Sequence, residues 1–235
     1  MFRFDGNDMD LEQVVIIGAG GFAREVLDVF DAINAVKASF VVQGFIVDPQ
    51  YGRPGAYVNG KPILGGFDWL AKNAQDVKAI CGVGASEHRF GLVKRAEEAG
   101  VRFCNAIHPR AVLTNWVNMG CGTVVTAGCT LTNQIRLGSH VHLNLNCTIG
   151  HDAVVEDFVT LAPGVNISGR VVLRQGCYVG TGANIIEDRE IGAWSIVGAG
   201  TTIVKDVPGN VTVVGSPGRV IKTRLEGWHL AWNNH

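Results

Sequence analysis

An aliphatic residue recurs at every sixth position across the second half of the chain. The seventeen positions of this series carry only isoleucine, leucine, valine or methionine: Ile107, Leu113, Met119, Val125, Leu131, Leu137, Leu143, Ile149, Val155, Leu161, Ile167, Leu173, Val179, Ile185, Ile191, Val197 and Ile203. The residue four positions later is Ala, Val, Thr, Cys, Ser or Ile, with Arg189 as the exception. A period of six fits neither an α-helix nor a plain strand, and it is typical of a parallel β-helix with stacked coils. The repeat therefore predicts a hexapeptide parallel β-helix.

This register also assigns a place to three of the six cysteines. Cys129, Cys147 and Cys177 fall at the small inward position, and no CxxC spacing occurs anywhere in the chain. We therefore expect buried reduced thiols rather than a disulfide framework or a metal site.

The first hundred residues alternate short apolar runs with helical patterns. Runs at 14–17, 40–48, 77–85 and 101–107 read as strands, and 87–100 reads as a helix. After the first run, Ala23, Val26, Leu27 and Phe30 recur at the three- to four-residue spacing of one helix face. Alternating strands and helices predict a small parallel sheet. The expected organisation is a Rossmann-like domain at 1–105, a β-helix domain at 106–214 and a tail at 215–235.

A glycine-rich turn joins the first expected strand to the first helix. The stretch Gly18-Ala19-Gly20-Gly21-Phe22-Ala23 fits G-x-G-x-x-G/A, a pattern that lets a phosphate approach a helix N-terminus. Asp48 and Gly84 end later strands and should lie at the same edge of the sheet. The motif predicts a nucleotide site, and a tight turn without a ligand is the alternative.

The pair His151-Asp152 stands out within the β-helix region. His151 comes two residues after Ile149, at neither inward position, so it should lie at a turn and point outward. A neutral imidazole, with an ordinary pKa near 6.5, suits general-base chemistry at physiological pH. His151 is therefore a candidate catalytic base, with a plain surface histidine as the alternative.

Charge and hydropathy exclude some classes of partner. The formal net charge is −1, which argues against nucleic acid or an anionic membrane surface as the main partner. No apolar run reaches the roughly 20 residues of a membrane span, and the acidic N-terminal segment lacks a signal-peptide core. We expect a cytoplasmic protein.

Six segments together resemble the NeuD/PglD-type nucleotide-sugar acetyltransferases, and the resemblance covers nearly the whole chain. They are IIGAGGFAREV (16–26), GFIVD (44–48), IHPRA (107–111), IGHDAVVEDFVTLAPG (149–164), IGAWSIVGAGTTIVKDV (191–207) and VVGSPGRVI (213–221). The resemblance implies a Rossmann-like α/β domain followed by an all-β left-handed parallel β-helix. It also implies acetyl-CoA as co-substrate and a homotrimer with active sites between neighbouring β-helices.

The resemblance also implies roles for individual residues. In the catalytic motif, His151 would be the general base and Asp152 its partner. The residues expected to bind the nucleotide sugar are Gly20, Gly21, Phe22, Asp48, Gly84 and, near the sugar amine, Asn144. The residues expected along the acetyl-CoA groove are Thr160, Gly169, Thr181 and Ala199. The chain departs from the family where Thr160 replaces a second histidine, where Phe22 replaces a histidine, and where Val47-Asp48 replaces two acidic residues.

The function that follows is N-acetylation of a nucleotide-linked 4-amino-4,6-dideoxy sugar, with His151 as base and glycine N–H groups as oxyanion donors. One alternative is O-acetylation of a sugar hydroxyl, and another is a non-catalytic nucleotide-binding trimer. A monomer would expose the outward-facing Trp116 and Trp194, which favours the trimer. The aromatic C-terminal segment is expected to pack on the trimer or to border the CoA adenine.

Overall fold

The structure is a computed structural model that describes residues 11–234 of the chain. The expectation about the N-terminal segment falls largely on residues 1–10, which lie outside the described residues. None of the helices formed by residues 11–234 has the length and hydrophobicity needed to span a bilayer.

The N-terminal part is built on a six-stranded sheet of order β3-β4-β2-β1-β5-β6. All neighbouring pairs are parallel except β3 and β4. The strands are β1 (Glu12–Ile17), β2 (Phe40–Ile46), β3 (Tyr57–Val58), β4 (Lys61–Gly65), β5 (Lys78–Cys81) and β6 (Arg102–Phe103).

Helices cover both faces of this sheet because successive side chains of the central strand β1 point to opposite sides. Val14 and Ile16 pack in one cluster with α1 (Gly21–Val36). Val15 and Ile17 pack in another with α2 (Phe67–Asn73) and α3 (Ser86–Glu98). The predicted α/β class is confirmed, and β3, β4 and α2 are elements that the sequence patterns did not reveal.

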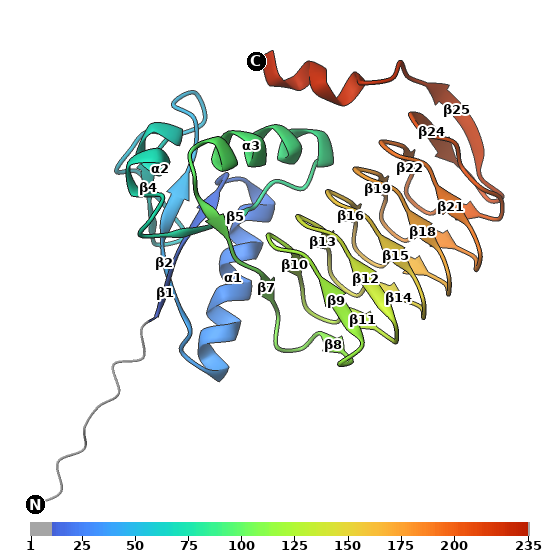
Figure 1. Cartoon of the computed structure of the whole chain (residues 1–235), viewed down its shortest axis with the longest axis horizontal. Helices are drawn as coiled ribbons and strands as arrows, with labels where there is room; N and C mark the ends of the chain where they lie inside the picture. The colour runs from blue at the N-terminus through green and yellow to red at the C-terminus, as the bar shows by residue number, and fades with distance from the viewer. Residues whose placement is uncertain (1–10, 235) are drawn as a thin grey trace, which may run out of the picture.

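From Ala106 onward the chain winds into a parallel β-helix with three faces (Figure 1). Successive coils span eighteen residues up to β22, so that Thr130 pairs with Thr148 in the next coil, and the last coil is shorter, with Ile196 paired to Thr212. The first face contains β7 (Ala106–Ile107), β10 (Val124–Val125), β13 (His142–Leu143), β16 (Thr160–Leu161), β19 (Tyr178–Val179), β22 (Ile196–Val197), β24 (Val211–Val214) and β25 (Arg219–Thr223). The second contains β8 (Val112–Leu113), β11 (Thr130–Leu131), β14 (Thr148–Ile149), β17 (Asn166–Ile167), β20 (Asn184–Ile185) and β23 (Thr202–Ile203). The third contains β9 (Val117–Met119), β12 (Ile135–Leu137), β15 (Val154–Val155), β18 (Val172–Leu173) and β21 (Glu190–Ile191).

The interior of the β-helix follows the predicted register. From Val125 onward the aliphatic series is buried in one continuous cluster with most of the small positions, and Cys129, Cys147 and Cys177 are fully buried there. Ile107, Leu113 and Met119 are partly buried and pack against it. Burying one large aliphatic side chain stabilises the fold by roughly 1.5–3 kcal/mol, and the series repeats this contribution in every coil. The parallel β-helix predicted from the repeat is confirmed, in the left-handed form that the resemblance implies.

Three corners join the faces, and they are named here by the faces they connect. The 1–2 corner includes Asn146 and Gly182, the 2–3 corner includes Asp152 and Arg170, and the 3–1 corner includes His140, Phe158 and Trp194. Each corner holds residues in the left-handed region, for example Asp152 at φ 60°.

The N-terminal part covers the first face and the 3–1 corner of the first coils (Figure 1). Val124, His142 and Thr160 point outward from the first face and are nevertheless 0–1% exposed. In a three-faced prism, the 2–3 corner lies opposite the first face. The N-terminal part and the 2–3 corner are therefore on opposite sides of the β-helix within one chain.

The C-terminal segment ends in η1 (Trp228–Asn234), which returns from the far end of the β-helix to pack on α3 (Figure 1). His229 stacks on Trp194 with ring centroids 3.6 Å apart, and Phe90 of α3 meets Trp194 edge-on. The expectation that a monomer exposes Trp194 is wrong, because these contacts leave it 7% exposed, whereas Trp116 is 59% exposed.

Candidate functional site

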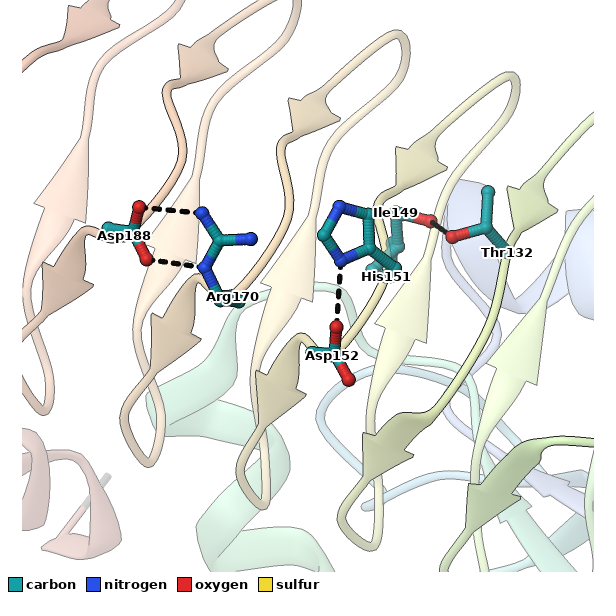
Figure 2. A network of polar contacts seen from close by, with 6 residues as sticks. All are labelled: Thr132, Ile149, His151, Asp152, Arg170 and Asp188. Atoms are coloured by element: carbon teal, nitrogen blue, oxygen red, sulfur yellow. Dashed lines mark hydrogen bonds and ion pairs between the residues drawn. The ribbon is translucent and has the colours of Figure 1, made fainter.

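His151 and Asp152 form the turn that follows β14 at the 2–3 corner (Figure 2). His151 Nδ1 lies 2.7 Å from Asp152 Oδ2, and both side chains are more than half exposed. An ionised carboxylate only accepts hydrogen bonds, so Nδ1 of a neutral ring carries the proton and Nε2 keeps its lone pair. The geometry presents Nε2 as a base at the surface.

Gly169 lies in the next coil, directly against the His151 ring. A Cβ at this position would lie 2.6 Å from His151 Cε1 and 2.7 Å from Nε2. Gly169 has no positive φ, so its glycine is needed for space rather than for backbone conformation. Within residues 11–234 its N–H has no assigned hydrogen-bond acceptor. The missing side chain thus places a free backbone donor beside the imidazole.

Arg170 and Asp188 continue the 2–3 corner beyond the histidine. Arg170 Nε lies 2.6 Å from Asp188 Oδ1 and Nη2 lies 2.8 Å from Oδ2, and the third guanidinium nitrogen is on the side of His151 (Figure 2). The hydrogen bonds from Arg170 lower the pKa of Asp188. The pair was not among the expected site residues. Its sequence signal is the eighteen-residue spacing of Asp152, Arg170 and Asp188, which stacks them at one corner of successive coils.

The glycine-rich turn lies at the carboxyl edge of the N-terminal sheet. Gly20 precedes α1 and Gly21 begins it, and a Cβ on Gly20 would have no neighbour within 4 Å. The Phe22 ring contacts His142 of β13, with centroids 4.9 Å apart. The N-terminus of α1 is therefore open to a phosphate. The first N–H groups of a helix have no intrahelical acceptor, so they can donate to such an anion.

Asp48 and Gly84 lie on either side of this turn, because they follow β2 and β5, the two strands that pair with β1. Both Asp48 oxygens accept hydrogen bonds of 2.8 Å from Arg95 of α3, and these bonds lower the pKa of Asp48. A carboxylate has further lone pairs, so a ribose hydroxyl can share this group. A Cβ on Gly84 would meet nothing within 4 Å, which leaves room at this edge.

Thr160 is placed differently from the expectation. It is 1% exposed, and its hydroxyl donates to the Gly84 carbonyl at 2.8 Å while accepting from Ser86 and Arg89. One hydroxyl proton and two lone pairs are thereby all used. In this chain, the side chain expected in the acetyl-CoA groove is instead sealed between the N-terminal part and the first face.

Asn144, Thr181 and Ala199 belong to the 1–2 corner. Asn144 is 9% exposed, whereas Thr181 and Ala199 lie on exposed turns of later coils. The second face separates them from His151 and Gly169 at the 2–3 corner. The structure thus groups the expected residues into two sets. One lies at the 2–3 corner. The other lies at the 1–2 corner, beside the carboxyl edge of the sheet with Gly20, Asp48 and Gly84, which is called the nucleotide edge below.

The most pronounced surface cavity does not bring the two sets together. This cavity of about 390 Å³ on the third face, beside Arg136, Glu156 and Gln175, is lined by none of the expected residues. No group of three or more His, Cys, Asp or Glu side chains among residues 11–234 is arranged to hold a metal ion.

Comparison with known proteins relates the whole chain to sugar acetyltransferases. The PglD N-terminal domain family matches residues 13–96. No curated protein matches the sequence.

Three solved structures match both parts of the chain. Perosamine N-acetyltransferase from Caulobacter crescentus, in complex with CoA and GDP-perosamine, is 29% identical over 89% of this chain and 97% of its own, with a TM-score of 0.82. The acetyltransferase domain of PglB from Neisseria gonorrhoeae, in complex with acetyl coenzyme A, is 26% identical over 90% and 100%, with a TM-score of 0.81. WeeI from Acinetobacter baumannii is 31% identical over 89% and 100%, with a TM-score of 0.79. The chain belongs to the NeuD/PglD-type family of sugar acetyltransferases.

Proposed function

We propose that the protein transfers the acetyl group of acetyl-CoA to the amino group of a nucleotide-linked 4-amino-4,6-dideoxy sugar. The observation that carries this proposal is the imidazole of His151, held through Nδ1 by Asp152 and open at Nε2 beside the Gly169 N–H. The sugar amine and the thioester give an amide and free CoA. An N–C bond forms, the C–S bond breaks, and one proton moves from nitrogen to the departing thiolate.

In this mechanism His151 moves the proton. Its Nε2 accepts a proton from the amine nitrogen as that nitrogen becomes acidic on attack, and the imidazolium then protonates the leaving thiolate. Asp152 keeps the ring in the required tautomer and stabilises the imidazolium. The Gly169 N–H is the proposed donor to the oxyanion of the tetrahedral intermediate, where a fixed dipole is most effective. Acetyl-CoA supplies the activated acyl group, and no cysteine or serine nucleophile is required.

An amine acceptor is favoured over a hydroxyl by the related structures. The Caulobacter enzyme is a perosamine N-acetyltransferase and binds GDP-perosamine, a nucleotide-linked amino sugar. In this chain, the open N-terminus of α1 and the space at Gly84 suit the diphosphate of such a substrate. We assign this part of the site to residues 1–105 and the acyl-transfer part to residues 106–214, with 215–235 as a tail.

The proposed assembly is a homotrimer, because one chain holds the two sets of site residues on opposite sides of its second face. A neighbouring chain that places its 2–3 corner against the 1–2 corner brings His151 to the nucleotide edge. Thr181 and Ala199 would then border a groove between two β-helices. The proposed location is the cytoplasm, where acetyl-CoA is available.

The test is a thiol-release assay with acetyl-CoA and a panel of GDP-, UDP- and dTDP-linked 4-amino sugars, run beside His151→Ala. We expect turnover on one amino sugar and a loss of at least about 10²-fold in kcat in the variant. Turnover that survives in His151→Ala would remove His151 as the base. Turnover on sugar hydroxyls alone would replace the N-acetyl assignment by O-acetylation.

A further inference from the structure

The side chain of Arg89 is fully buried between the two parts of the molecule. Arg89 lies in the first turn of α3, which begins at Ser86 immediately after the Val83–Gly84 loop. It is 0% exposed and is the largest fully buried side chain among the described residues. A buried guanidinium without compensating partners is strongly unfavourable, so its partners determine its role.

Those partners come from both parts of the chain and are mostly carbonyl oxygens. On the N-terminal side, Nη1 donates to Val83 O at 2.9 Å and to Gly84 O at 3.0 Å. On the β-helix side, Nε donates to His140 O at 3.0 Å and Nη2 donates to Phe158 O at 2.7 Å. Nη2 also donates to Thr160 Oγ1 at 2.9 Å, and Nη1, which shares two protons among three acceptors, lies 3.1 Å from His142 Nδ1.

The contact with His142 fixes the state of that histidine. Arginine can only donate, so His142 Nδ1 accepts and the ring proton is on Nε2. Burial, and then the charge of Arg89, hold the pKa of His142 well below its usual value, so the ring is neutral. Burial lowers the pKa of Arg89 itself to about 10, which leaves the guanidinium charged at neutral pH. The neutral His142 ring in turn supports the ring of Phe22 in the glycine-rich turn.

Arg89 thus reaches two of the residues expected to bind the nucleotide. It holds Gly84 directly through the carbonyl oxygen and supports Phe22 through His142. Thr160 strengthens the first connection, because its hydroxyl donates to the same Gly84 carbonyl and accepts from Arg89. Both connections run from rigid coils of the β-helix to loops at the carboxyl edge of the sheet.

We propose that Arg89 is a positioning residue for the nucleotide sugar, which fixes the Gly84 loop and the Phe22 turn against the first face of the β-helix. This inference rests on the proposed function, since it assumes that a nucleotide binds at this edge. It assigns a binding role to a side chain that makes no contact with the ligand. Loss of Arg89 therefore weakens nucleotide binding selectively, beyond any loss of stability.

The same helix offers a matched control for a purely structural role. Phe90, the next residue, packs across the same interface against Phe158 and Trp194, and it has no contact with the Gly84 loop or with His142 among those described. Phe90→Leu should lower the melting temperature because it loosens the interface. It should leave nucleotide binding unchanged.

The experiment measures binding of GDP, UDP and dTDP by calorimetry, together with binding of CoA, in the full-length protein. For the nucleotide that the wild type binds, Arg89→Met should raise Kd by about tenfold or more while Kd for CoA changes by less than about twofold. Arg89→Lys should recover part of the affinity, because an ammonium keeps the charge and reaches fewer carbonyls. Thr160→Val changes no charge and removes the hydrogen bond from the Thr160 hydroxyl to the Gly84 carbonyl. It should weaken nucleotide binding by about threefold.

The outcomes separate this inference from the proposed function. If folded Arg89→Met binds the nucleotide as tightly as the wild type, the inference is overturned. An equal loss of nucleotide affinity in Phe90→Leu overturns it as well. If Arg89→Met does not fold, an unchanged affinity in Thr160→Val overturns it. If the wild type binds none of the three nucleotides, both the inference and the proposed nucleotide site fail. The thiol-release assay then still tests the acetyltransferase activity independently.

Discussion

At the residue scale, the proposed catalytic site depends on how closely two coils approach at the 2–3 corner. The hexad register predicts that His151 points outward, because it fixes which positions face the core. It does not predict what the imidazole touches. That contact comes from the eighteen-residue coil, which stacks Gly169 beside His151, and from the absence of a side chain at Gly169.

Gly169→Ala should abolish most of the activity and leave the fold intact. The three atoms nearest to the new methyl group would all belong to the His151 ring, at 2.6–3.1 Å, and this exposed side chain can swing aside. We expect kcat to fall by about 10²-fold and the free energy of unfolding to change by less than about 1 kcal/mol. Steady-state kinetics and urea unfolding measure the two quantities, with Ser168→Ala as the control. A variant with normal kcat would contradict the proposed position of the base.

Asp152→Asn should lower kcat by roughly 10-fold to 100-fold, less than His151→Ala, because Asp152 orients the ring and does not itself transfer the proton. Asparagine tolerates the left-handed backbone at φ 60°, so the turn is preserved. Asp188→Asn is the matched control, since Asp188 shares the corner and the backbone conformation but pairs with Arg170. An equal loss of kcat in both variants would assign the effect to the corner as a whole.

At the element scale, the 3–1 corner and the first face show where prediction from sequence ends. The strands, the inward residues and the order of the two parts follow from local patterns. The burial of Thr160 and Trp194 does not, because the hexad register distinguishes inward from outward and says nothing about what covers an outward side chain. Here α3 and η1 supply the cover, through contacts between segments far apart in sequence.

The same cover makes His140 a source of acid sensitivity. Its ring stacks on Phe158 and is 2% exposed, and burial, with Arg89 and Lys94 nearby, lowers its pKa to about 4. Between pH 6.5 and about 4 the unfolded chain binds a proton at His140 that the folded chain does not. The contribution of the neutral His140 ring to the free energy of unfolding is therefore complete above pH 6.5 and is lost as the pH falls.

The expected loss from His140 is on the order of 3 kcal/mol by pH 4. His140→Asn removes the titrating ring and suits the left-handed backbone at φ 57°. Urea unfolding at pH 7 and pH 4.5 should therefore show a smaller loss of stability on acidification for the variant than for the wild type. Equal losses would mean that His140 does not carry the effect.

At the scale of the whole molecule, the separation of the two sets of site residues decides how the enzyme must be assembled. The N-terminal part covers the first face, and His151 lies at the corner opposite that face. No rotation of a side chain bridges the β-helix between them. If the nucleotide sugar binds and the chains assemble as proposed, a sugar held by one chain meets His151 of a neighbour. Two variants that are each inactive at a different set should then restore activity when they are mixed.

This expectation is tested by co-expressing two inactive variants with different affinity tags. His151→Ala lacks the base, and Gly20→Glu places a carboxylate at the N-terminus of α1, where a Cβ has open space and the diphosphate is expected. Each variant alone should be inactive and trimeric. In every mixed trimer, one of the three sites combines an intact nucleotide edge from one chain with an intact His151 from its neighbour, which is about a third of the sites. Doubly purified material should therefore regain about a third of the wild-type kcat. Mixed trimers as inactive as the single variants would place each complete site within one chain, and a monomeric wild-type mass would exclude the shared site altogether.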